Sequence, residues 1–271
     1  MSDTLQSSSL KEILDHQIND LPNDIALCLS GGIDSIALFS LLLEHGKKIN
    51  VYSFAFDESS HDFIIARSLA DKAKCHFTPI FLPRDIETLK NDVLTLHKDY
   101  GCVKKTEYEC VWPFLYVYPC IKESVIVTGL GSEGHFGTTK KASIHFKNDL
   151  DSFRREFFSN PNVSQKNQHE ALCKNFHIAS WFPFLTKEVF DWSLGKTYDE
   201  INKPKLKQPL IDMITFDIRP KPSNLQCGSG IREHFDELLT TSWNRHNYKS
   251  VVGVLNEINK GAKFNAVWEL I

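Results

Sequence analysis

Long hydrophobic runs, closely paired cysteines and clustered cations are all missing from this 271-residue sequence. The longest apolar run, residues 36–43, is interrupted by Ser40 and is far shorter than the roughly 18 residues that cross a bilayer, so we expect no membrane segment. The polar, acidic start argues against a secretory leader. Seven scattered cysteines without a C-x-x-C pair argue against a disulfide framework or a zinc knuckle, and favour a reducing, cytoplasmic compartment.

Charge is distributed unevenly between the two halves of the chain. Residues 1–135 carry 12 Lys+Arg and 19 Asp+Glu, a net charge of −7, whereas residues 136–271 carry 19 and 15, a net charge of +4. The basic excess is modest and spread out, so a nucleic-acid partner is not expected. It either supplies cations to a phosphate ligand held by the first half or forms an ordinary solvated surface.

The first half of the chain alternates short apolar runs with helical patterns. Strands buried on both faces of a sheet are continuously apolar, and this is the character of the runs at 25–29, 49–56, 77–82 and 125–128. Helical spacing occurs at 33–45, 61–74, 86–98 and 110–121. The alternation predicts an α/β fold with a parallel, twisted sheet and helices on both of its faces.

After about residue 145 the pattern changes, and helical spacing dominates. It occurs at 150–158, 187–194, 231–239 and 250–258. We therefore divide the chain into residues 1–145, a nucleotide-binding α/β region, and residues 146–271, a mainly helical region that completes the site. The stretch 159–168 is expected to be a mobile connection.

The most informative segment is Ser30-Gly31-Gly32-Ile33-Asp34-Ser35, which follows one buried strand and opens a helix. Two adjacent glycines allow backbone N–H groups to wrap an anion, and the helix N-terminus adds free donors. Ser30 and Ser35 add hydroxyl groups. The loop therefore predicts a phosphate site at the carboxyl end of a parallel strand.

Asp34 is the discordant member of this loop, because a carboxylate repels phosphate oxygens unless a cation lies between them. Mg²⁺ binds one or two carboxylates together with substrate phosphates, so Asp34 predicts a metal–nucleotide complex. The alternative is a purely structural role, in which the glycines form a tight turn and Asp34 interacts with the helix dipole. The strings G-x-x-x-x-G-K-[ST] and G-x-G-x-x-G are absent, which disfavours kinase-like and dinucleotide-binding sites.

These motifs resemble those of a known family. SGGIDS resembles the SGGxDS loop of the N-type ATP pyrophosphatases, or PP-loop superfamily, and TGLGSEGHFG at 128–137 resembles the S-G-E-G-x-D-E-x-F-G signature of one branch. That branch is the synthetase domain of asparagine synthetase and β-lactam synthetase. Weaker resemblances are SFAF at 53–56, PFL at 183–185 and Arg219-Pro220-Lys221 with GSG at 228–230. The glutaminase domain of asparagine synthetase is not recognised in the chain.

The resemblance implies an adenine nucleotide α-hydrolase-like fold and an amide-forming ligase that uses ATP and Mg²⁺. Such enzymes adenylate a carboxylate, release pyrophosphate and transfer the acyl group to ammonia or an amine, with a separate protein as one candidate source of the ammonia. The resemblance places the loop residues Ser30, Gly31, Gly32, Asp34 and Ser35 on the phosphates. It places Phe56, Thr128 and Gly129 at adenine and ribose, Asp34 and Glu133 on Mg²⁺, and Lys221 as the catalytic cation. A solvated loop lysine is the alternative for Lys221.

The sequence also departs from the family pattern. The two family glutamates of the second signature are Leu130 and Gly134 here, and leucine cannot accept a proton in the amide-forming step. His135 is a nearby candidate base, although we expect it on a helix or turn surface.

The run Lys203–Lys207 is interpreted as an exposed loop or as a lid over phosphates. Alternatives for the whole protein are a tRNA-modifying or nitrile-forming PP-loop synthetase, or a degenerate nucleotide-binding partner without turnover.

Overall fold

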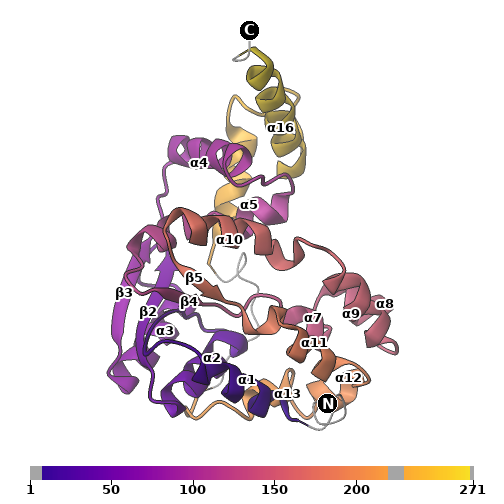
Figure 1. Ribbon diagram of the computed structural model, residues 1–271. Helices are drawn as coiled ribbons and strands as arrows, with labels where there is room; N and C mark the ends of the chain where they lie inside the picture. The colour runs from indigo at the N-terminus through magenta and orange to yellow at the C-terminus, as the bar shows by residue number, and fades with distance from the viewer. Residues whose placement is uncertain (1–7, 219–228, 269–271) are drawn as a thin grey trace.

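Five parallel strands form one sheet in the centre of the protein, which we describe from a computed structural model covering residues 8–218 and 229–268. The strands are β1 (Asp24–Cys28), β2 (Lys48–Ala55), β3 (His76–Phe81), β4 (Val125–Val127) and β5 (Ala179–Trp181), in the spatial order β3-β2-β1-β4-β5. Every neighbouring pair is parallel, with Leu27 opposite Val51 on one side and Val127 on the other. The predicted α/β class with a parallel sheet is confirmed (Figure 1).

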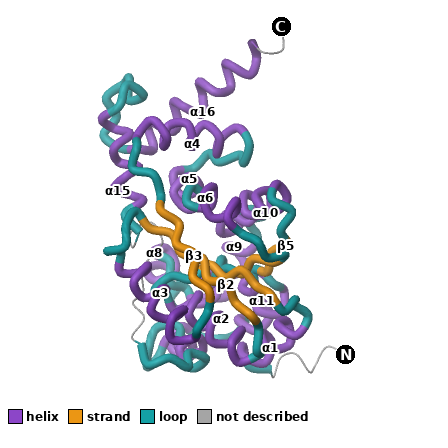
Figure 2. Tube along the Cα trace, turned by 90° about the vertical axis from the view of Figure 1, so that its left-hand side faces the viewer, coloured by secondary structure: helices purple, strands orange, loops and turns teal. Residues whose placement is uncertain are grey.

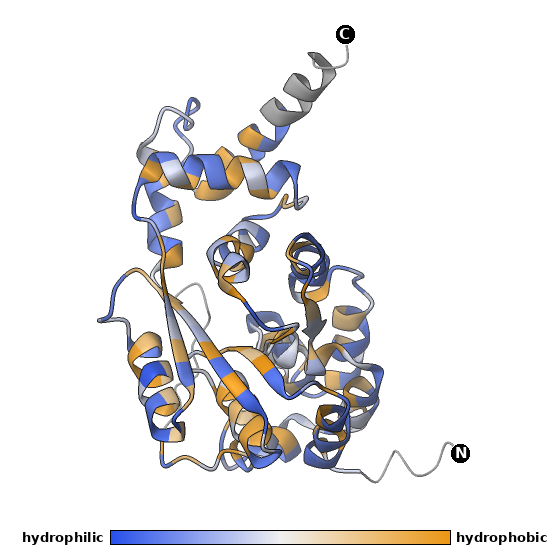
Figure 3. Ribbon diagram, turned by 60° about the vertical axis from the view of Figure 1, so that its left-hand side comes forward, coloured by the Kyte–Doolittle hydropathy of each residue, from blue (hydrophilic) through white to orange (hydrophobic). Residues whose placement is uncertain are grey.

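Helices cover both faces of this sheet because successive strand residues point to opposite sides. Ile25 and Leu27 belong to the core cluster that contains α1 (Leu10–Asn19), α2 (Ile33–Glu44), α3 (His61–Ala73) and α11 (Lys187–Ser193). Ala26 belongs to the cluster on the other face. That cluster includes residues of α4 (Ile86–Lys98), α5 (Lys105–Val111), α6 (Phe114–Val117), α10 (Lys166–Asn175), α15 (Ile231–Asp236) and α16 (Val251–Trp268). Figure 3 shows apolar residues concentrated on the strands between these layers.

Short helices that follow the first three strands in the chain complete the molecule. They are α7 (Ser132–Phe136), α8 (Lys140–His145), α9 (Leu150–Phe158), α12 (Tyr198–Asn202) and α13 (Gln208–Ile211), with 3-10 turns η1 (Tyr118–Cys120), η2 (Val163–Gln165), η3 (Pro183–Leu185) and η4 (Glu237–Thr240). The second half is mainly helical, as predicted. Figures 1 and 2 show α4 and α16 together at the end of the molecule opposite α1.

Three local predictions need correction. Residues 110–121 form no continuous helix, because Pro113 lacks an N–H and its ring clashes with the preceding turn; α5 ends at Val111 and α6 begins at Phe114. The stretch 159–168, expected to be a mobile connection, contains η2 and the start of α10, and Gln168 is buried. The second half also contributes the edge strand β5, which we did not expect. The domain boundary near residue 145 stays a prediction.

Candidate functional site

The strand order brings the two glycine-rich segments to one point. After β1 the chain builds β2 and β3 on one side of β1, whereas β4 and β5 lie on the other side. The carboxyl ends of β1 and β4 therefore mark the position where the strand order reverses, which is the usual ligand position in open α/β sheets. The loop 30–35 follows β1, and the segment 128–131 follows β4. A Cβ added at Gly129 would lie 3.0 Å from the Cβ of Asp34, so the two segments touch.

The loop 30–35 is held in shape by its own serines. The hydroxyl of Ser35 accepts from the backbone N–H of Ser30 at 3.1 Å, and the Ser30 hydroxyl accepts from the N–H of Gly32 at 3.2 Å. The two hydroxyl oxygens are 3.1 Å apart. In this structure both serines therefore shape the loop, and a phosphate contact by either hydroxyl stays a prediction.

Gly31 is required where the loop packs against α3. A Cβ at Gly31 would lie 2.7 Å from Asp62 Oδ1 and 3.3 Å from the Asp62 Cα, closer than real Cβ atoms come to a carboxylate oxygen. The glycine therefore allows close packing, in addition to the anion wrapping inferred from the sequence.

Asp34 lies in the first turn of α2 and bonds to two residues from distant parts of the chain. Lys207 Nζ lies 2.7 Å from Oδ1 and 2.8 Å from Oδ2 of Asp34, and the Ser132 hydroxyl donates to Oδ1 at 2.8 Å. The ammonium also lies 2.9 Å from the Ser132 hydroxyl oxygen. Lys207, Asp34 and Ser132 form a closed polar trio, which we call the Asp34 trio.

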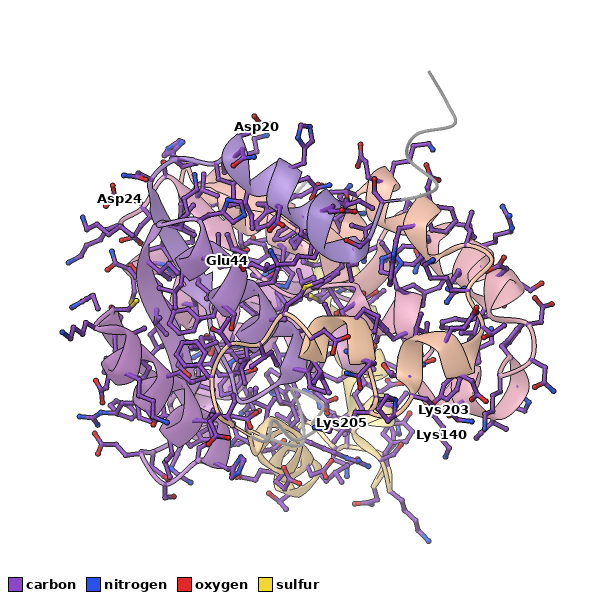
Figure 4. The ribbon with its side chains drawn as sticks, turned by 90° about the horizontal axis from the view of Figure 1, so that it is seen from below. Asp20, Asp24, Glu44, Lys140, Lys203 and Lys205 are labelled. Atoms are coloured by element: carbon purple, nitrogen blue, oxygen red, sulfur yellow. The ribbon has the colours of Figure 1, made fainter. Side chains whose placement is uncertain are left out.

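Lys207 corrects the interpretation of the Lys203–Lys207 run as an exposed loop. Lys203 and Lys205 are exposed, but Lys207 exposes only 8% of its surface. Figure 4 labels Lys203 and Lys205, apart from the labelled acidic residues Asp20 and Glu44. Nothing in the local sequence distinguishes Lys207 from its two neighbours, except that it directly precedes the apolar segment of α13.

Asn202 fixes the backbone from which Lys207 projects. Its side-chain amide donates to the carbonyl of Phe136 at 2.9 Å, and its side-chain oxygen accepts from the N–H of Lys207 at 3.0 Å. Lys207 has a φ of 58°, a left-handed conformation that an ordinary residue adopts only when its surroundings hold it there. The same asparagine therefore connects α7, which carries Ser132, to the segment that carries Lys207.

The donor set of the trio fits a hard cation. Asp34 offers a carboxylate and Ser132 a hydroxyl, both oxygen ligands of the kind that Mg²⁺ takes, and a positive charge already lies between them in the form of the Lys207 ammonium. Among the described residues no three His, Cys, Asp or Glu side chains converge as a complete metal site. A metal at Asp34 would therefore take further ligands from phosphate and water.

Glu133, the second predicted metal ligand, makes a different contact from Asp34. Its Oε1 accepts from the hydroxyl of Ser164 in η2 at 2.8 Å. Ser132 and Glu133 are consecutive in α7, so their side chains leave the helix in different directions. The metal role of Glu133 stays a prediction.

His135 is part of the core and not of a surface, contrary to expectation. It is fully buried, its Nε2 donates to the carbonyl of Phe184 at 2.6 Å, and its Nδ1 lies 3.1 Å from the Ser193 hydroxyl. Burial, with a smaller contribution from the nearby Arg154 and Lys207, lowers the pKa of His135 to about 4. With both ring nitrogens engaged in the interior, His135 is unsuited to be the missing base.

The family's second glutamate has no space at position 134. A Cβ at Gly134 would lie 2.5 Å from two ring carbons of Phe157 in α9. An aromatic side chain therefore fills the room that the carboxylate would need. Leu130 is only partly buried. Neither position supplies a group that handles protons.

The predicted adenine region lies beside a cavity. Phe56 directly follows β2 and borders a cavity of about 440 Å³ that Arg84, Gly230 and His234 also line. The Phe56 ring lies 5.9 Å from that of Trp112 and 5.2 Å from that of His234. Trp112 is fully buried, so these rings belong to the core beside the cavity.

Thr128 and Gly129 directly follow β4, and their predicted place at adenine and ribose stays a prediction. Thr128 is buried, and its hydroxyl has no hydrogen-bond partner among the described residues. A buried hydroxyl of this kind normally finds a partner, so Thr128 retains a free hydrogen-bonding group next to the trio's loop. Lys221, the predicted catalytic lysine, lies outside the described residues together with Arg219 and Pro220.

Comparison with known proteins agrees with this geometry. Residues 10–137, slightly less than half of the chain, match the family model described as asparagine synthase. The resemblance inferred from the two glycine motifs is thereby confirmed. The match supports an ATP-utilising synthetase.

Comparisons with solved structures and with curated proteins add little to the family match. The structure of NMN synthetase from Francisella tularensis is similar over 83% of this chain and 89% of that chain, with 14% sequence identity and a TM-score of 0.36. A comparison with curated proteins gives no match. None of the helices in the described ranges is both long and apolar enough to cross a membrane.

Proposed function

We propose that this protein is an ATP- and Mg²⁺-dependent ligase that adenylates a carboxylate and transfers it to ammonia or an amine, releasing AMP and pyrophosphate. The observation that carries the proposal is the Asp34 trio, where the loop after β1, the segment after β4 and a buried lysine meet. The family match supports the nucleotide and the ligase class.

The loop 30–35 would bind the β- and γ-phosphates. Its backbone N–H groups and the N-terminus of α2 offer donors and a partial positive charge to an anion. Lys207, already buried at this position, would add a full positive charge. Mg²⁺ held by Asp34, and in the family's arrangement by Glu133, would neutralise charge on the phosphates.

The first half-reaction joins the substrate carboxylate to the α-phosphorus. A carboxylate oxygen attacks phosphorus, the bond to the bridging oxygen breaks, and pyrophosphate leaves. Negative charge grows on the departing phosphates, so cations positioned beforehand, Lys207 and the predicted Lys221, lower the barrier. Phe56, Thr128 and Gly129 would hold adenine and ribose in place for this attack.

The second half-reaction joins nitrogen to the acyl carbon and expels AMP. The nitrogen loses a proton in this step, and Leu130, Gly134 and the buried His135 provide no base for it. The nucleophile would therefore enter as a neutral amine or ammonia and pass its proton to the departing phosphate or to water. A separate protein is a possible source of the ammonia.

Pyrophosphate release tests the proposal. The protein is incubated with ATP and Mg²⁺ across a panel of carboxylic acids, with ammonium or simple amines in parallel, and pyrophosphate is measured. Release that depends on one acid supports the ligase, and amide formation identifies the nitrogen donor. Release that depends on a tRNA, or conversion of the acid to a nitrile, supports another PP-loop synthetase. Tight ATP binding without release across a broad panel supports a non-catalytic partner protein.

A further inference from the structure

The Lys207 ammonium occupies the place on Asp34 that a metal ion needs. An ammonium group has three N–H donors, and its three nearby acceptors here are the two oxygens of Asp34 and the hydroxyl of Ser132, at 2.7, 2.8 and 2.9 Å. The ring of Phe136 closes another side, with its centroid 5.8 Å from the ammonium. The hydrogen-bonding capacity of the ammonium is therefore fully used.

The backbone of Lys207 is anchored independently of its side chain. Its N–H donates to Asn202, and its carbonyl accepts from the N–H of Leu210 at 2.9 Å in the first turn of α13. Rotation about the side-chain bonds can therefore move the ammonium away from Asp34 while the main chain stays in place. Lysine has a long flexible stem that suits such a movement.

The net charge around Asp34 determines whether a free or a nucleotide-bound metal ion binds there. With Lys207 in contact, the pair is close to neutral and offers little attraction to a free divalent ion. A metal–nucleotide complex differs, because its phosphates are anionic and give the ammonium a new partner. The departing ammonium gains phosphate oxygens as the metal gains the carboxylate, so neither charge is left unpaired.

We propose that the Lys207 ammonium and the divalent cation compete for the oxygens of Asp34 and Ser132, so that the metal enters only as its nucleotide complex. The inference rests on the proposed function, because it assumes that nucleotide phosphates are the second partner of Lys207. In the absence of nucleotide the lysine keeps the carboxylate in its ion pair and excludes the free metal.

Mn²⁺ binding without nucleotide tests the competition directly. Mn²⁺ accepts the same oxygen ligands as Mg²⁺ and is measured by electron paramagnetic resonance. We expect the unaltered protein to bind Mn²⁺ only weakly, and Lys207→Met, which lacks the competing ammonium, to bind it about tenfold more tightly, a difference of about 1.4 kcal/mol. Lys205→Met is the matched control, because Lys205 is exposed on the same loop and has no ion pair among the described residues; it should bind like the unaltered protein.

The double variant Lys207→Met with Asp34→Asn should lose the gain, because the carboxylate that binds the metal is gone. Circular dichroism melting of each variant, with and without Mn²⁺, establishes that it is folded; Mn²⁺ should raise the melting temperature of Lys207→Met alone. Lys207→Arg, which keeps the charge, provides a second variant and should bind Mn²⁺ as weakly as the unaltered protein. Folded Lys207→Met that binds Mn²⁺ no more tightly than the unaltered protein overturns the competition.

The failure of this inference can be distinguished from failure of the proposed function. Mn²⁺ binding is measured without substrate and needs no turnover, whereas the ligase is tested by acid-dependent pyrophosphate release. Tighter Mn²⁺ binding by Lys207→Met, without release on any acid, would uphold the competition and contradict the ligase. If the unaltered protein releases pyrophosphate but Lys207→Met binds Mn²⁺ no more tightly, the ligase is supported and the competition is contradicted.

Discussion

The Lys207 ammonium bridges both carboxylate oxygens of Asp34, although the two residues are 173 positions apart in the chain. This ion pair joins the loop after β1 to the helical second half. The match to the asparagine synthase family ends at residue 137, so Lys207 lies beyond it. The first half therefore does not contain the whole candidate site, and the second half supplies one of its charges.

Asp34 should be indispensable for pyrophosphate release. We expect Asp34→Asn to lower the rate about a hundredfold or more, the usual loss when a group that stabilises developing charge is removed. Asp20→Asn is the control, because Asp20 is exposed at the end of α1 (Figure 4). Its rate should match that of the unaltered protein. A folded Asp34→Asn variant with normal release would show that the metal assignment is wrong.

Gly31 should matter for stability because of its packing against α3. We expect Gly31→Ala to lower the free energy of unfolding by about 1–3 kcal/mol, the usual cost of forcing an extra methyl group into a packed site. Gly32→Ala is the comparison, because its Cβ would meet only the Ser30 hydroxyl, at 3.3 Å. Urea denaturation measures both. Equal losses would mean that contact with Asp62 does not set the requirement at position 31.

The elements that could be predicted are those with a local physical cause. The first four strands are short apolar runs because both of their faces are covered, and each observed boundary lies within about two residues of the prediction. The strand β5 has three residues, two of them exposed, and so leaves no such run. Helix α1 went unnoticed although Ser9 and Glu12 form a capping box, a signal that is present in the sequence.

The candidate site could be predicted only where its residues have a local sequence signal. Gly31, Gly32 and Asp34 could be recognised from the sequence, because an anion-binding loop with a metal needs glycines and a carboxylate directly after the strand. Lys207 is not, because a buried lysine looks the same in a sequence as an exposed one, and only a contact made across 173 positions gives it a partner. The burial of His135 has the same kind of cause: the surrounding layers, including Phe158 stacked on its ring with centroids 4.4 Å apart, come from later segments.

Glu133 can be tested as a metal ligand against its bond with Ser164. If Glu133 binds the metal, Glu133→Gln should weaken Mn²⁺ binding to the protein–ATP complex about tenfold, because one ionised oxygen ligand is lost. Ser164→Ala removes only the hydroxyl that donates to Glu133 and should leave Mn²⁺ affinity nearly unchanged. Unchanged affinity in Glu133→Gln would remove this residue from the metal site. Equal weakening in both variants would instead mean that Ser164 orients the carboxylate.

The burial of His135 makes folding stability depend on pH. Its pKa falls from 6.5 to about 4 in the folded protein, chiefly through burial, so between these values the unfolded chain binds a proton that the folded protein does not. Stability is therefore fully present above about pH 6.5 and is lost as pH falls toward 4, by at most about 3 kcal/mol from this residue. His169, whose pKa burial lowers to about 3, adds a loss of the same sign.

Urea denaturation of the unaltered protein and of His135→Gln between pH 7 and 4 measures this contribution. Glutamine is chosen because its amide can still donate to the carbonyl of Phe184 and does not titrate. We expect the variant to be less stable than the unaltered protein at pH 7, but to lose less of its stability on acidification. If both proteins lose stability equally over this range, His135 is not held neutral by burial, and the acid sensitivity belongs to other groups such as His169.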